Sequence, residues 1–180
     1  MKKELYQIIE IPEGVEVSFA DGKIKVKGKE GEIEKGVSMG ALDFSIEGNK
    51  IRIGNKKSTK REKKMMNTIK AHTLNMIQGV QEKYEYKLKI CFSHFPITVE
   101  IKGNEAAVKN FLGEKIPRKV NIPAGAEVKA DKTHVTITSV DKEIAGQAAA
   151  NFETATKIRG RDKRVFQDGI FMIEKAGREI

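Results

Sequence analysis

The chain has 180 residues, 39% of them hydrophobic and 33% charged, so it can bury one larger core or two small ones and is too apolar for a disordered protein. Its net charge of +9, from 34 Lys and Arg against 25 Asp and Glu, favours a polyanionic partner. No stretch approaches the roughly 18 consecutive apolar residues of a membrane span, so nucleic acid is favoured over a membrane.

The first ten residues carry charge but no long apolar run. Polar Gln7 and Glu10 interrupt the hydrophobic segment that a signal peptide requires. We therefore expect the chain to stay in the cytoplasm.

Short stretches of alternating hydrophobicity follow, and this period of two predicts half-buried strands over residues 23–27, 32–34, 42–46 and 50–53. Turn-forming residues such as Asp21-Gly22 and Gly48-Asn49 separate them, which favours an antiparallel meander. The run from Gly28 to Gly31 resembles the GxxG loop of KH domains, but that loop joins two helices. Because strand patterns flank it here, we interpret it as a hairpin turn.

The period becomes helical after Thr59. Thr59 and Glu62 have the spacing of a capping box, and Gly79 is a suitable stop, so we expect one helix between them. The residues that recur at helical spacing after Thr59 are Met65, Met66, Ile69, Thr73, Met76, Ile77 and Val80.

The second half of the chain repeats the first. Residues 12–17 correspond to residues 96–101, and Ile51 and Ile53 to Val135 and Ile137, at a shift of 84. Between these two matches, Val26-Lys27 and Gly31-Glu32 correspond to Val108-Lys109 and Gly113-Glu114 at a shift of 82, which requires a small insertion. A second helix should follow Asp141, with an apolar stripe of Ile144, Ala145, Ala148, Phe152 and Ala155. We predict an α+β fold of two tandem homologous domains, residues 1–81 and 82–180, each a small antiparallel β-sheet packed with one α-helix. One continuous sheet with coincidental similarity is the alternative.

Groups that could catalyse a reaction do not converge in the sequence. His72, His94 and His134 are far apart and pair with no residue at metal-ligand spacing. Cys91, the only cysteine, excludes an internal disulfide and lies in a strand-like run, so we interpret it as a packed thiol. We expect no catalytic residues, no metal, no cofactor and no enzymatic activity.

A first basic cluster surrounds the expected start of the first helix. This helix-start cluster consists of Lys56, Lys57, Lys60, Arg61, Lys63 and Lys64. Cations at a helix N-terminus oppose the helix dipole, which suggests a compensating anion and a second candidate RNA contact. A solvated charge run is the alternative, since salt screens the repulsion.

A second basic cluster, the arginine loop, covers residues 157–164 in an irregular segment after the second helix. A guanidinium can bind phosphate oxygens with two parallel hydrogen bonds, and a glycine between arginines lets the backbone approach a partner. We predict RNA binding through Lys157, Arg159, Gly160, Arg161, Lys163 and Arg164.

With these features in place, the whole chain resembles the large-subunit ribosomal protein six family, in its archaeal and eukaryotic branch. The most specific part of the resemblance is Ile158, Arg161, Arg164, Phe166, residues 168–172 and Lys175, although Thr154 stands where a glutamine is expected. The resemblance implies binding to large-subunit rRNA near the sarcin–ricin loop, largely through the second domain. It also implies that Phe166 and Asp168-Gly169 form the turn that fixes the arginine loop, and that residues 170–173 pack it back on the domain.

The partners expected from the resemblance are large-subunit rRNA, neighbouring large-subunit proteins and, by proximity, translation factors. A free-standing RNA-binding protein with a regulatory role is the alternative, because it would use the same basic surfaces. A small hydrolase or transferase is the third reading, and a deep pocket with converging His or carboxylate groups would support it.

Overall fold

The computed structural model describes residues 3–180, which divide into two compact units, one ending at Lys83 and the other beginning at Tyr84. The division lies two residues beyond the expected boundary, just after the end of helix α1 (Lys60–Gln81). Within residues 3–180, neither helix combines the length and the apolar character needed to cross a membrane.

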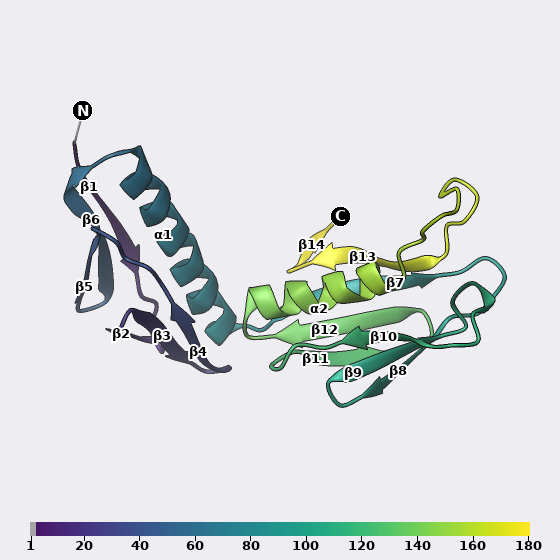
Figure 1. Cartoon of the computed structure of the whole chain (residues 1–180). Helices are drawn as coiled ribbons and strands as arrows, with labels where there is room; N and C mark the ends of the chain where they lie inside the picture. Colours follow the sequence, from purple (N-terminus) through teal and green to yellow (C-terminus); the bar gives the residue numbers. More distant parts are fainter. Residues whose placement is uncertain (1–2) are drawn as a thin grey trace. The chain divides into compact units, whose positions relative to one another are not determined.

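The first unit contains two three-stranded antiparallel sheets covered by α1 (Figure 1). One sheet has the order β1-β6-β5, from β1 (Lys3–Glu10), β6 (Lys50–Ser58) and β5 (Asp43–Glu47). The other is a meander of β2 (Glu16–Ala20), β3 (Lys23–Gly28) and β4 (Gly31–Gly36). The alternation that predicted the strands is confirmed on β3, where Ile24 and Val26 are fully buried between exposed lysines. The prediction of one meander was wrong, because β4 and β5 belong to different sheets: β6 pairs with β5 and also with β1, a strand that the alternation did not reveal.

The capping box at the start of α1 is confirmed, since Thr59 and Glu62 exchange hydrogen bonds across the first turn. Gly79 as the stop was wrong. It is buried inside α1, which continues because Val80 is fully buried in the core of the unit. The helix ends at Gln81 and is capped by Glu82, whose extended backbone donates its N–H to the carbonyl of Gln78.

The second unit repeats this strand order, and the predicted α+β class with tandem homologous domains is confirmed. Its small sheet has the order β10-β9-β8, from β10 (Arg118–Asn121), β9 (Glu105–Lys109) and β8 (Thr98–Lys102). Its large sheet has the order β11-β12-β7-β13-β14, in which β11-β12-β7 matches β5-β6-β1 of the first unit. The strands of that sheet are β11 (Glu127–Ala130), β12 (His134–Ser139), β7 (Tyr84–Cys91), β13 (Gly169–Lys175) and β14 (Arg178–Glu179).

The expected insertion lies between β9 and β10. Residues 110–117, which include a 3-10 turn at Phe111–Gly113, replace the tight turn of residues 29–30 in the first unit. Gly113 is therefore not the structural counterpart of Gly31, which begins β4.

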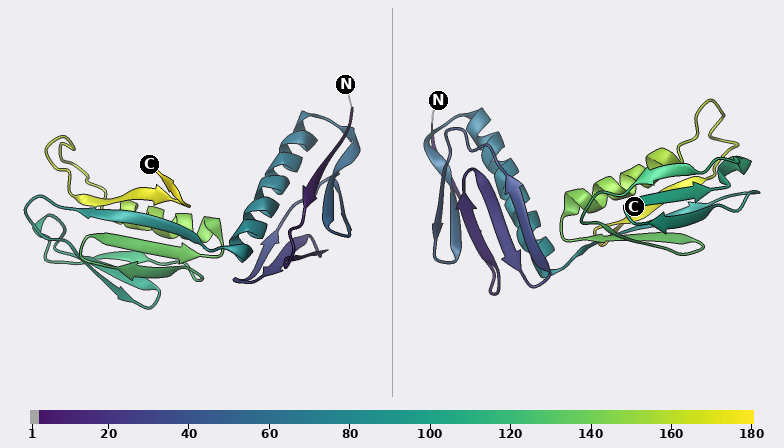
Figure 2. Two further views of the ribbon diagram at one scale, coloured as in Figure 1. Left: turned by 180° about the vertical axis from the view of Figure 1, so that it is seen from behind. Right: turned by 60° about the horizontal axis from the view of Figure 1, so that its bottom comes forward.

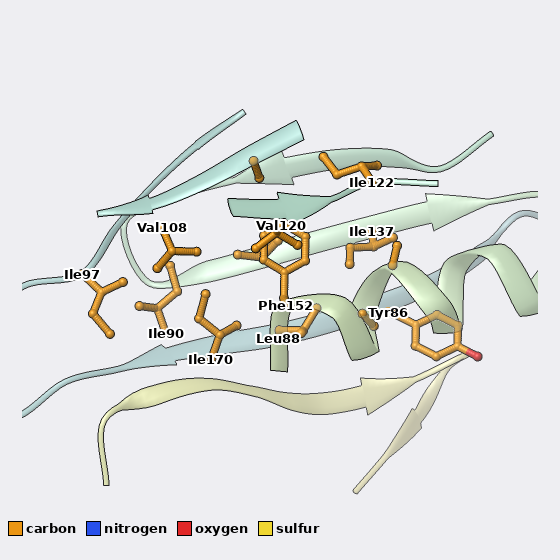
Figure 3. Close-up of a cluster of buried hydrophobic side chains, with 14 of the residues drawn as sticks. Tyr86, Leu88, Ile90, Ile97, Val108, Val120, Ile122, Ile137, Phe152 and Ile170 are labelled. Carbon is orange, nitrogen blue, oxygen red and sulfur yellow. The ribbon is translucent and has the colours of Figure 1, made fainter. Parts of the chain in front are cut away.

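Helix α2 (Lys142–Ala155) packs against both sheets of the second unit. Asp141 caps it as predicted, by accepting the backbone N–H of Glu143 at 2.8 Å. Figure 3 shows Phe152 of α2 in the cluster that includes Val120 of the small sheet and Leu88 of the large one. Burying a side chain of this size contributes about 1.5–3 kcal/mol, so Phe152 holds the end of the helix firmly in place.

Candidate nucleic-acid interface

The connection between α2 and β13, residues 156–168, projects from the end of the second unit in each view (Figures 1 and 2). Two buried polar side chains fix its ends. Thr156 accepts the backbone N–H of Ile170 at 3.0 Å, and Asp168 accepts both the N–H and the hydroxyl of Ser93 at 2.9 Å. The connection is irregular, as predicted, but it is held at its stem.

A turn centred on Asp162 shapes the tip. Its backbone carbonyl accepts the N–H groups of Val165 and Phe166, and its carboxylate binds the Arg164 guanidinium at 2.8 Å. Hydrogen bonds from the side chain and then the backbone of Arg164 lower the pKa of Asp162. The cation of Arg164 is therefore partly compensated within the loop.

Phe166 packs against the hydrophobic core. The guanidinium of Arg161 lies 4.9 Å from the centre of its ring, a cation–π distance that restrains the arginine. Gly160 has a φ of +67°, which a side-chain-bearing residue rarely adopts, so the chain can bend between Arg159 and Arg161.

Two hollows flank the arginine loop, and Thr154 and Ile158 line both of them. The first, which we call the aromatic cleft, has a volume of 810 Å³. Its lining includes three phenylalanines and two lysines: Phe92, Phe166, Phe171, Lys157 and Lys163. The second, which we call the basic notch, has a volume of 560 Å³, and its lining includes Arg118, Arg159, Arg161 and Glu114.

Arg118 is a residue of the basic notch that sequence reasoning missed. Its guanidinium donates to the backbone carbonyl of Ala155 at 2.8 Å, and a cation at this position stabilises the negative end of α2. The same guanidinium lies 4.2 Å from the centre of the Phe111 ring. Hydrogen bonds from Arg118 lower the pKa of Glu114, and the positive charge of Arg161 lowers this pKa further. Three arginines thus share one small surface around a single carboxylate.

The six predicted residues of the arginine loop are all exposed, but they do not share one environment. Lys157 and Lys163 line the aromatic cleft, whereas Arg159 and Arg161 line the basic notch. Arg164 is paired with Asp162. Thr154, where a glutamine was expected, is exposed at the border of the two hollows.

The helix-start cluster belongs to the first unit and is divided between two elements. Lys56 and Lys57 lie on β6, and the other four members lie on the first two turns of α1. All six are exposed. Lys60, Lys63 and Lys64 border a shallow depression on the exposed face of the helix, so this cluster is flatter than the surface around the arginine loop.

No converging catalytic groups emerge in the described part of the chain. Residues 3–180 contain no group of three or more His, Cys, Asp or Glu placed to hold a metal ion. The three histidines lie on α1, in the β7–β8 connection and on β12. Cys91 is half-buried at the end of β7, and the run from Gly28 to Gly31 is the predicted hairpin turn rather than a KH loop.

Comparison with known proteins gives one consistent family. The model of the family described as ribosomal protein L6 matches residues 11–83 and 95–169, one segment in each unit. The large ribosomal subunit protein uL6 of Methanobrevibacter smithii is 44% identical over 93% of this chain and 94% of its own length. The protein of the same name from Sulfurisphaera tokodaii is 43% identical over 95% of this chain and 92% of its own length. The one from Methanothrix thermoacetophila is 39% identical over 97% of this chain and 99% of its own length.

Proposed function

Because the chain belongs to the ribosomal protein L6 family, we propose that it is a structural component of the large ribosomal subunit in the cytoplasm and attaches to its rRNA mainly through the second unit. Neighbouring large-subunit proteins and that rRNA are then its partners. No enzymatic role is part of the proposal.

The arginine loop carries the proposal. It presents exposed cations on an irregular segment whose stem is anchored, so the loop loses little conformational freedom when it binds. Arginine forks match phosphate oxygens in direction as well as charge. The basic notch adds Arg118 to this surface, close to Arg159 and Arg161.

We place the attachment near the sarcin–ricin loop and hence near the docking region of translation factors. Support comes from the resemblance of residues 158–175 to the C-terminal signature of the family's archaeal and eukaryotic branch. A protein–RNA crosslinking map of assembled subunits tests it, since adducts from the arginine loop should fall in or beside that rRNA stem-loop. Adducts confined to distant rRNA helices would refute the location without affecting the rRNA-binding role.

Two matched variants test which basic surface attaches the protein. The first replaces Arg159, Arg161, Lys163 and Arg164 with glutamine, and the second does the same for the equal number of cations at Lys56, Lys57, Lys60 and Lys63. Each phosphate contact contributes about 0.7–0.9 to the slope of log affinity against log salt, so losing four contacts should reduce the slope by roughly 3. The first variant should show most of this change and should enter salt-washed large subunits poorly.

The second variant should lose less affinity and should melt slightly higher, because removing cations from the positive end of α1 relieves repulsion. Circular dichroism establishes that both variants are folded. A larger loss of subunit incorporation in the second variant would mean that the first unit carries the main RNA-binding surface.

A further inference from the structure

The aromatic cleft is not explained by phosphate binding, which requires cations but no exposed rings. We propose that this cleft receives one unstacked nucleobase of the bound RNA, held against Phe171 and Phe92, while the arginine loop binds the flanking phosphates. The inference rests on the proposed function and adds a specific type of contact to it.

Phe171 has the geometry of a stacking platform. It is 47% exposed, although its neighbour Ile170 on β13 is fully buried. Its ring lies against the backbone of Gly169, where an added Cβ would come within 2.9 Å of the ring. The far end of the ring is therefore held against the strand, and the exposed part of the ring is available to a ligand.

Phe92 contributes a second exposed ring from a different segment. It is 43% exposed and follows directly after β7. The next residue, Ser93, donates both of its hydrogen bonds to Asp168 at the end of the 156–168 connection. The same hydrogen bonds that hold the stem of the connection therefore hold Phe92 beside the cleft.

Two lysines beside the exposed rings favour a nucleotide over an apolar peptide segment. Lys157 and Lys163 contribute these cations to the lining of the cleft. Its two carboxylates are engaged by the fold, because Glu153 accepts the backbone N–H of Met172 at 2.9 Å and Asp168 accepts both donors of Ser93. Exposed aromatic rings beside flexible cations are the pattern with which proteins bind unpaired bases. The volume of 810 Å³ lies within the roughly 300–1,000 Å³ of small-ligand sites.

The test uses the full chain and purified large-subunit rRNA of Methanobrevibacter smithii, with affinity measured at several KCl concentrations. The variant combines Phe92→Leu and Phe171→Leu, which keeps apolar volume but removes the flat rings. Stacking on an aromatic ring corresponds to roughly a 5- to 140-fold change in affinity per base, so we expect a loss of at least about fivefold at every salt concentration. The slope against log salt should stay parallel to that of the unmodified protein, because no cation is lost.

Phe95→Leu is the matched control. Phe95 comes from the same β7–β8 connection and is similarly exposed, at 41%, but its ring lies over Gly113 and lines neither hollow. This control should bind rRNA like the unmodified protein. Ultraviolet crosslinking of the unmodified complex provides a measurement that does not depend on the folding of any variant, and it should yield base adducts on the peptides that contain Phe92 or Phe171.

The outcomes separate this inference from the proposed function. If the double variant binds as tightly as the control and adducts occur only on the arginine loop, rRNA binding stands and the base site is refuted. If the double variant binds rRNA normally but enters subunits poorly, the cleft holds a protein segment and the inference is again wrong. If the unmodified protein shows no salt-dependent binding to the rRNA, both proposals fail.

Discussion

Replacing Asp168 with alanine should loosen the arginine loop without removing any of its cations. The carboxylate is 3% exposed and accepts two hydrogen bonds, from the N–H and the hydroxyl of Ser93. Hydrogen bonds to a charged group contribute about 1.5–3 kcal/mol each. Because Ser93 is exposed, water can satisfy its donors after the change, so we expect a combined loss of about 2 kcal/mol.

Hydrogen exchange measured by mass spectrometry on peptides that cover residues 166–172 tests this magnitude. The free energy of local opening should fall by about 2 kcal/mol, which is roughly a 30-fold increase in the open population. Ser93→Ala removes one of the two donors and should cost about half as much. Asp168→Asn keeps the shape but not the charge, so it should also be intermediate.

Binding to rRNA gives the second measurement for the Asp168 variant. Affinity should fall because the loop must be ordered on binding, whereas the slope against log salt should not change. Local opening that stays within about 0.5 kcal/mol of the unmodified protein would show that the Asp168 hydrogen bonds do not hold the loop.

Two further predictions concern the first unit. Gly28→Ala should lower its free energy of unfolding in urea by about 1–3 kcal/mol, because an added Cβ would lie 2.7–2.9 Å from atoms of Val80, including its backbone carbonyl oxygen. Gly36→Ala is the control: its added Cβ meets no atom within 4 Å, so this variant should be tolerated. Hydrogen bonds from Thr59 lower the pKa of Glu62 below its usual 4.5, so the stability that this capping box provides is complete above that pH and is lost as the pH falls through the lowered value. Thermal melts of Glu62→Gln should therefore depend less on pH in the acidic range, and an unchanged dependence would refute this role of the carboxylate.

The repeat and the start of each helix could be predicted because their signals are local. Thr59 and Glu62 are three residues apart, and a capping box depends on little beyond that spacing. β1 was missed because a strand that pairs with β6 some fifty residues later leaves no local turn signal beside it. Gly79 led to a wrong helix end because the unfavourable helix propensity of glycine costs less free energy than the burial of Val80 gains. This burial extends α1 past the glycine.

The basic residues of the candidate site could be found as a run, but its shape could not. Arg118 reaches the end of α2 from a position 37 residues earlier in the chain, and no spacing rule links it to Ala155. The aromatic cleft combines Phe92, Phe166 and Phe171 from three segments. Each looks like an ordinary apolar residue in the sequence, so only tertiary structure distinguishes an exposed ring from a core residue.

The different lengths of the two helices give the two units different surfaces at corresponding positions. In the first unit, the last turn of α1 covers the β3–β4 turn, since the Val80 carbonyl accepts the Glu30 N–H at 2.9 Å and no side chain fits at Gly28. In the second unit, α2 has 14 residues instead of 22. Counted from the caps at Thr59 and Asp141, residues 74–81 of α1 correspond to residues 156–163, most of which form the arginine loop.

The earlier end of α2 has two structural consequences in the second unit. The chain beyond it forms the arginine loop, and the last helix turn that covers the β3–β4 turn in the first unit has no counterpart over the β9–β10 connection, where residues 113–117 are exposed and lead into Arg118. Both sides of the basic notch depend on this shorter helix. Extending α2 by two turns would be expected to remove both at once, whereas lengthening the exposed part of the 110–117 connection should leave the core unchanged.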